Sequence, residues 1–270
     1  MRRASLVITL VAVLIGGGAT PAHAGGTVKI ECRWSHRASD DPIVFPGRPG
    51  AAHSHEFFGN RSTNANSTYS TMIGQATTCD VAGDTAGYWV PTLLGSAGQV
   101  IAPRRIVVYY RDRPQPSRLT TAFPPDFRLI AGAPQAGVSG WSCDGLVNGA
   151  TSRIDCTGFS TPYVRGRIIF PSCGRVDGSG NLIKDSPDHR SHVAYFTSAS
   201  AGCPAAYPIQ LPQLTMNVRY GVTNCIAAGC YLASDRSAGC SVPGCSLHAD
   251  FWNTWNQTAL QNMVTTILNA

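Results

Sequence analysis

The chain has little lysine and few charges of either sign. Lys29 and Lys184 are its lysines, 13% of its residues are charged, and the formal net charge is +6. Removing the two N-terminal arginines from the 21 basic residues leaves 19 against 15 acidic ones, or about +4. This excess is too mild for a nucleic-acid binder, which needs a concentrated basic face. It is compatible with an acidic glycan or an anionic cell wall as the partner.

Several catalytic motifs are also absent from the sequence. There is no Gly-x-Ser-x-Gly elbow, no P-loop and no dinucleotide fingerprint, so serine hydrolases of the elbow type and common nucleotide-binding classes are set aside. There is no His-Glu-x-x-His, which removes support for zincin protease chemistry. The reaction has to be inferred from less familiar clusters.

Long apolar runs are missing after the first residues. The chain starts with Met1-Arg2-Arg3, is apolar from Leu6 to Ile15 and reaches Ala22-His23-Ala24. This pattern predicts a secretory signal peptide over residues 1–24. We expect residues 25–270 to form one secreted, extracellular domain that is released without a membrane anchor and acts as a monomer.

Glycine and proline are abundant, with 28 and 18 residues, which favours turns and short strands over a helix bundle. We therefore expect a mainly β fold, a single disulfide-stapled β-sandwich-like domain with long loops and a C-terminal helix. Alternation and β-branched residues predict strands at 27–32, 87–94, 106–110, 165–173, 193–196 and 214–220, and one ending at 132. Residues 34–50 lack periodicity and predict a loop, residues 141–156 a hairpin, and residues 256–269 an amphipathic helix.

All ten cysteines follow the expected signal peptide. An even number in an exported chain predicts disulfides, although spacing does not fix their connectivity. Local closures are plausible for Cys143/Cys156, Cys173/Cys203, Cys225/Cys230 and Cys240/Cys245, which leaves Cys32 and Cys79 to close a longer loop. The last four cysteines also have zinc-like spacing, but disulfides are the favoured reading in this setting.

Histidines gather in three short segments, His53-Ser54-His55-Glu56, Asp188-His189-Arg190-Ser191-His192 and His248-Ala249-Asp250. Residues i and i+2 of a strand share a face, so His53 and His55 are expected to be neighbours. We expect the three segments to converge, with Asp41, into one site. A single histidine in such a segment would more often have a structural role, with its ring hydrogen-bonded to the backbone of an irregular loop.

Taken together, these segments resemble a family of secreted proteins from actinobacteria and filamentous fungi whose domain has no assigned function. The resemblance implies candidate positions but no reaction, and fungal relatives joined to a WSC carbohydrate-binding module favour glycans. Gly174 stands where the family usually has Trp, and Thr254 interrupts its usual Asn-Gly-Trp. The matching pieces are Asp41-Pro42-Ile43…Pro46-Gly47, His53-Ser54-His55, Tyr88-Trp89-Val90-Pro91, Tyr109-Tyr110, Phe123-Pro124…Phe127-Arg128, Phe170-Pro171-Ser172-Cys173, Asp188 to Tyr195, Gly202-Cys203-Pro204 and His248-Ala249-Asp250-Phe251.

The first functional hypothesis is acid–base chemistry on a cell-wall or extracellular polysaccharide, as a hydrolase or a lyase. Histidine titrates near neutrality, and paired carboxylates are the usual equipment of glycosidases. The candidate catalytic residues are Asp41, His53, His55, Asp188, His189, His192, His248 and Asp250. The candidate substrate-binding residues are Tyr88, Trp89, Tyr109 and Arg190.

Two alternatives remain open. One is a metal site, with a divalent transition metal as cofactor and His53, His55, His192 and His248 as ligands, because imidazoles from several segments suit Zn²⁺ or Cu²⁺. The other is a non-catalytic glycan-binding module that uses arginine and aromatic side chains.

Overall fold

The protein is described by a computed structural model over residues 25–113, 118–133, 138–143, 155–159, 162–198, 201–225 and 228–270. The expected signal peptide, residues 1–24, lies outside these described residues, as does the middle of the expected 141–156 hairpin. No helix of the described ranges is long and apolar enough to cross a membrane.

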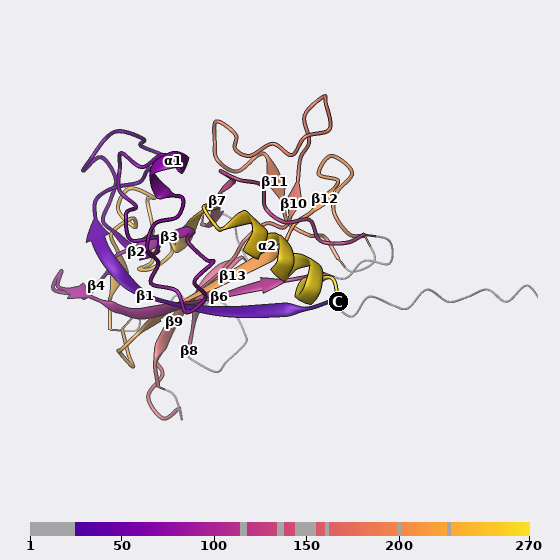
Figure 1. Cartoon of the computed structure of the whole chain (residues 1–270). Coiled ribbons are helices and arrows are strands. Elements are labelled where there is room, and N and C mark those ends of the chain that lie inside the picture. The colour runs from indigo at the N-terminus through magenta and orange to yellow at the C-terminus, as the bar shows by residue number, and fades with distance from the viewer. Residues whose placement is uncertain are drawn as a thin grey trace, which may run out of the picture.

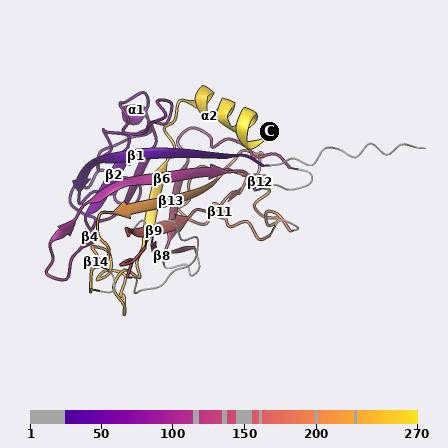
Figure 2. The ribbon, with the colours of Figure 1, turned by 90° about the horizontal axis from the view of Figure 1, so that it is seen from below.

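Nine antiparallel strands form the main sheet (Figures 1 and 2). Its two end regions meet, because β7 and β9 contact each other, so the sheet curls into a nearly closed barrel-like shape. The mainly β class is confirmed, but one curled sheet takes the place of two sheets packed face to face. In order across the sheet the strands are β7 (Arg128–Gly132), β15 (His248–Trp252), β3 (Gly87–Pro91), β2 (His55–Gly59), β1 (Thr27–Ala38), β6 (Pro103–Arg111), β13 (Gln213–Tyr220), β9 (Val164–Ile169) and β8 (Ser139–Cys143).

Two small three-stranded sheets lie beside the main one. They are β11 (Val193–Ala194), β10 (Cys173–Gly174) and β12 (Ile209–Gln210), and β14 (Tyr231–Leu232), β4 (Leu93–Leu94) and β5 (Val100–Ile101). A single helical turn, α1 (Tyr69–Met72), lies within the loop that follows β2.

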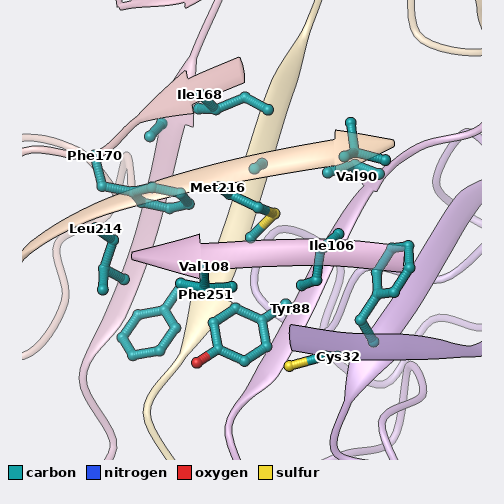
Figure 3. Close-up of a cluster of buried hydrophobic side chains, with 14 of the residues drawn as sticks. Cys32, Tyr88, Val90, Ile106, Val108, Ile168, Phe170, Leu214, Met216 and Phe251 are labelled. Carbon is teal, nitrogen blue, oxygen red and sulfur yellow. The ribbon is translucent and has the colours of Figure 1, made fainter. Parts of the chain in front are cut away.

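The core fills the inside of the curled sheet. Figure 3 shows side chains of β6 and β13, such as Val108 and Met216, meeting Phe251 of β15 and Tyr88 of β3. All four side chains are at most 1% exposed. Alternate residues of a strand point to the same face, which is why Val164, Gly166 and Ile168 of β9 are buried while the residues between them are partly exposed.

β1 is twice as long as the predicted strand at 27–32. Its twelve residues continue through Trp34 to Ala38, and the pairing with β2 contains a β-bulge between Trp34 and His36. The bulge shifts the alternation of side chains by one residue, so residues 34–38 show no regular pattern in the sequence. The loop expected from residue 34 therefore starts after Ala38.

The predicted C-terminal helix is confirmed as α2 (Gln257–Met263) followed by a π-helical segment, η1 (Val264–Leu268). In both ribbon views α2 lies beside the start of β1 (Figures 1 and 2). Leu260, Met263 and Val264 recur at helical spacing and are buried, whereas Ile267, which would continue this spacing, is 43% exposed and Leu268 is buried instead. The wider π turn explains this, since it rotates the last side chains relative to an α-helix.

Five disulfides staple the loops to this sheet, and they join the pairs expected from the sequence. They are Cys32–Cys79, Cys143–Cys156, Cys173–Cys203, Cys225–Cys230 and Cys240–Cys245. Among the described residues no cysteine is free, so the zinc-like spacing of the last four does not reflect a zinc site.

Candidate functional site

The histidine site lies on the outer face of the β7–β15–β3–β2 part of the sheet. The register pairs Asp250 with Trp89 on one side and with Ile130 on the other. Trp89 in turn pairs with Phe57, so these four residues form one outward-facing row. His55 and His248 lie two residues further along β2 and β15 on the same face, which brings residues almost 200 positions apart into one cluster.

The loop after β1 folds over this outer face. The carboxylate Oδ1 of Asp41 accepts the backbone N–H groups of Ile43 and Val44, both at 3.0 Å, which fixes the turn that the Asp-Pro sequence begins. Burial raises the pKa of the Asp41 carboxyl, although these two hydrogen bonds act against it. The loop thus delivers a buried carboxyl group to the site.

Three imidazoles meet beneath this loop. The ring centroids of His53 and His55 are 4.2 Å apart, and that of His248 lies 5.2 Å from His53 and 5.8 Å from His55. One nitrogen from each ring lies within 4.8 Å of the other two. The expectation that His53 and His55 would be neighbours is confirmed, although His53 precedes β2, and His248 joins them from a distant strand.

Backbone carbonyl groups orient two of these rings. His55 Nδ1 lies 2.9 Å from the carbonyl oxygen of Asp40, and His248 Nδ1 lies 2.8 Å from that of Ser246. A carbonyl oxygen can only accept, so both Nδ1 atoms carry the hydrogen and both Nε2 atoms keep a free lone pair. His55 Nε2 and His53 Nε2 are buried without a hydrogen-bond partner among the described residues.

Burial keeps the three rings neutral. It lowers the pKa of His53, lowers that of His248 to about 4, and lowers that of His55 well below its ordinary value, where His53 and His248 add to the effect. Each ring therefore offers a lone pair rather than a positive charge at neutral pH.

Asp250 completes the cluster. Its carboxyl group is fully buried, and neither oxygen has a hydrogen-bond partner in the described part of the chain. Its nearer contact to His248 is 3.9 Å, between Oδ2 and Nε2, which is too long for a hydrogen bond. Burial holds the pKa of Asp250 well above its ordinary value, and the Asp41 carboxylate raises it further. One oxygen each from Asp41 and Asp250 and one nitrogen of His55 lie within 4.8 Å of one another.

A cleft of about 610 Å³ leads to this cluster. His53, His248, Asp41 and Asp250 line it, and its walls come from residues 187–190 and from parts of the segment 234–246. His55 lies behind these residues and is fully buried. The volume falls within the range of small-molecule sites in proteins.

The segment 187–190 contributes to the wall in a different way from the histidine cluster. Asp188 Oδ1 accepts the N–H groups of Arg190 and Ser191, at 3.1 and 2.9 Å, so its carboxylate holds the turn together. These bonds hold the pKa of Asp188 well below its usual range. His189 lies in the left-handed region, with φ of 56°, and its Nδ1 is 2.8 Å from Asp185 Oδ1. The Arg190 guanidinium donates to the carbonyl oxygens of Ile130 and Ala133.

His192 does not join the cluster, although the sequence placed it there. Its Nε2 donates to the carbonyl oxygen of Arg128 at 2.8 Å, and its Nδ1 lies 2.9 Å from Ser186 Oγ. The ring is packed edge-on against Phe127 at 5.4 Å. Both nitrogens are used by the fold, so His192 has the arrangement of a structural residue.

Three of the four expected substrate-binding residues also lie away from the cleft. Tyr88 is in the interior, where its hydroxyl contacts Asp84 and Tyr110. Trp89 is fully buried beneath the cluster against Phe57. Tyr109 lies on the outer face of β6, under the guanidinium of Arg111. Arg190 is the member of this set that lines the cleft.

The His192→Ala variant tests this division of the histidines. Removing two buried hydrogen bonds is expected to lower the free energy of unfolding by about 1–3 kcal/mol, measured by urea denaturation. The three-histidine cluster is untouched, so any ligand that it binds should keep its stoichiometry. Unchanged stability would show that His192 is dispensable for the fold.

Asp235 shapes the other wall and carries no sequence signal that identifies it. Its carboxylate accepts the N–H groups of Leu232, Gly244 and Ser246, at 2.9, 2.6 and 3.2 Å. It thereby fixes the loop closed by Cys240–Cys245 and aims the Ser246 carbonyl at His248. Contacts of this kind depend on where the loop folds back, which sequence spacing does not reveal.

Comparison with known proteins gives a family but no reaction. A family model described as "Domain of unknown function (DUF1996)" matches residues 41–255. No curated protein and no solved structure matches the chain.

Proposed function

Because the chain belongs to the DUF1996 family, whose description names no reaction, we propose its function from the site itself. The protein binds one divalent transition-metal ion at the floor of the cleft, and this centre acts on an extracellular polysaccharide. The observation that carries the metal proposal is the convergence of three neutral imidazoles whose ligand atoms lie within 4.8 Å of one another.

The donor set fits such an ion. His55 and His248 present Nε2 lone pairs because their Nδ1–H groups are held by carbonyl oxygens, the usual arrangement around metal-binding histidines. His53 Nε2 and both Asp250 oxygens are buried without protein partners among the described residues. Imidazole and carboxylate together suit Zn²⁺, Cu²⁺ or Mn²⁺, with nitrogen distances of about 2.0–2.1 Å for zinc. The rings need to close inward on the ion.

Charge balance favours the same conclusion. Two buried carboxyl groups, Asp41 and Asp250, face three neutral rings, and burying a carboxylate without a partner is costly. A cation within about 4–6 Å favours the charged form of a carboxyl group. Metal binding would therefore stabilise Asp250 as a carboxylate.

A metal ion of this kind supplies Lewis acidity and lowers the pKa of bound water toward neutrality. The chain's own residues would hold the ion and position the substrate. His53 and His248 line the cleft directly, and Arg190 presents a positive charge held by two carbonyl oxygens. A polysaccharide substrate is supported by the size of the cleft and by the exposed Ser237 in its wall.

A second candidate is acid–base catalysis without a metal. It is favoured by the 3.9 Å approach of His248 to Asp250, whose pKa values are displaced in opposite directions from their ordinary values. Such a pair offers a neutral base beside a protonated acid at neutral pH.

Metal analysis of the secreted protein, purified without chelators, distinguishes the two. We expect about one transition-metal ion per chain, and micromolar or tighter binding when the stripped protein is titrated with Zn²⁺, Cu²⁺ and Mn²⁺ by calorimetry. The His189→Asn variant, altered in the same cleft but outside the cluster, should bind equally well. A folded, stripped protein that binds none of the three ions would overturn the metal proposal. Product release from a polysaccharide panel by the stripped protein would instead support the acid–base candidate.

A further inference from the structure

A row of arginines crosses the outer face of the other half of the sheet. Arg33 of β1 pairs with Arg105 of β6, Arg105 with Arg219 of β13, and Arg219 with Arg165 of β9. Figure 2 shows these four strands side by side in this order. Neighbouring strands lie about 4.8 Å apart, so the row places one guanidinium-bearing residue per strand over about 14 Å.

Three of these arginines line a hollow of about 1060 Å³, together with Arg61 and Arg104. The acidic residues of this lining are Glu31 and Asp80, so five arginines face two carboxylates and the lining carries an excess charge of +3. The Glu31 carboxylate already forms ion pairs with Lys29 at 2.6 Å and with Arg105 at 3.2 Å. The fold therefore concentrates positive charge here, although the chain as a whole has little.

The alignment places like charges opposite one another on neighbouring strands. Like charges in such positions repel each other and destabilise a sheet. The row contains three such pairs in succession. If these arginines served only to keep this face of the sheet solvated, their positions along the strands would not matter. The register instead aligns them in one row.

Aromatic side chains accompany the charges. The Arg104 guanidinium lies over the ring of Tyr163, 5.0 Å from its centroid. Trp34 also lines the hollow and is 42% exposed. Its ring is held in place by a 2.6 Å hydrogen bond from Nε1 to Glu56 Oε2. An exposed, fixed ring next to fixed cations offers apolar contact to a sugar and charge to an anionic group.

We propose that this arginine row is a binding surface for an acidic polysaccharide that lies across the strands, with carboxylate or phosphate groups seated on successive arginines. It is separate from the histidine cleft and stands without the metal proposal. Uronate polymers and phosphate-linked wall polymers share the required chemistry, and a single-stranded nucleic acid is the competing polyanion.

The Arg33→Gln/Arg105→Gln variant tests the proposal. Both side chains are exposed, so the melting temperature should stay at or above that of the unmodified protein. Binding is followed by calorimetry at low and high salt with polygalacturonate, a glycerol-phosphate polymer and a neutral glucan. We expect one acidic polymer to bind, its dissociation constant to rise at least tenfold in the variant, and the dependence of log K on log salt to weaken by about one to two units. The better polymer identifies the anionic group.

The matched control is Arg175→Gln/Arg236→Gln, which removes the same charge from two exposed positions outside the hollow. It should change the dissociation constant less than twofold. Equal losses of affinity in both variants would show that binding depends on the total charge of the protein, and would overturn the proposal that the arginine row is the binding surface. Binding of single-stranded DNA with none to either acidic polysaccharide would overturn it as well.

Discussion

Replacing His248 by glutamine is expected to remove stoichiometric metal binding, with a rise in the dissociation constant of more than about 100-fold. Losing a supporting contact outside the ligand set already costs 10- to 100-fold in metal affinity, and His248 would be a ligand itself. Glutamine fills much of the space but lacks the imidazole ring, whose Nε2 lone pair is directed by the hydrogen bond from Nδ1 to the Ser246 carbonyl oxygen. The measurement is calorimetric titration of the stripped protein, checked by metal content after dialysis.

Thermal unfolding gives a second readout of the same variant. A ligand that binds the native state alone stabilises it by an amount that grows with the logarithm of its concentration over the dissociation constant, about 2.7 kcal/mol at a concentration 100-fold above that constant. The unmodified protein should therefore melt higher with metal, and the His248→Gln variant should not. The control is His189→Asn, which should keep the metal-dependent shift. A variant that still binds one ion per chain would show that His248 is not a ligand.

Local features of the site could be predicted because they depend on short spacing. His53 and His55 are two residues apart and their ring centroids lie 4.2 Å apart, although β2 begins only at His55. The short-range disulfides join cysteines that are close in the chain, as Cys225–Cys230 shows. The motif resemblance was also sufficient to identify the family, which the match over residues 41–255 confirms. In each case a few neighbouring residues contain the necessary information.

Side-chain direction in turns could not be predicted in this way. Asp188 and His192 belong to the same short motif as Arg190, yet Asp188 caps a turn and His192 is bonded into the fold beside Phe127. His189 has a positive φ, which redirects the chain within the motif. No periodic pattern governs such a segment, so its residue types indicate chemistry without showing where each side chain points.

The curl of the sheet is likewise a long-range property. Alternation along β15 shows that His248, Asp250 and Trp252 share a face, but it does not show that β15 lies between β3 and β7. That order decides which side chains surround the histidines. A sandwich and a nearly closed single sheet impose the same alternation, and the choice depends on pairing between distant strands.

Asp84 should make the stability of the fold fall as pH rises. Its fully buried carboxyl accepts a 2.8 Å hydrogen bond from the Tyr88 hydroxyl. Tyr88 lies 2.5 Å from the Tyr110 hydroxyl, which accepts a bond from Trp255 Nε1. Burial raises the pKa of Asp84 to about 8, against the hydrogen bonds from Tyr88 and Ala86, which lower it. The chain of hydrogen bonds thus ends on an acid that stays protonated at neutral pH.

The direction of the effect follows from proton binding. Between its ordinary value of 3.8 and about 8, Asp84 keeps its proton in the folded state and loses it in the unfolded state. Stability is therefore complete below the ordinary pKa, falls by about 1.4 kcal/mol per pH unit across this window, and falls no further above it. The upper bound of the loss is about 6 kcal/mol, and water entering the opened site will reduce it.

Asp84→Asn isolates this contribution because asparagine keeps an acceptor for Tyr88 and has no proton to lose. Urea unfolding of both proteins at pH 4 and pH 8 should show a fall in stability that is smaller in the variant by at least about 2 kcal/mol. Other titrating groups are common to both proteins and cancel in the comparison. Any bound metal is removed beforehand by chelation, so that metal binding does not contribute to the pH dependence. Equal falls in the two proteins would mean that Asp84 ionises in the folded state near its ordinary pKa, and that the interior around Tyr88 and Tyr110 is more accessible to water than its burial implies.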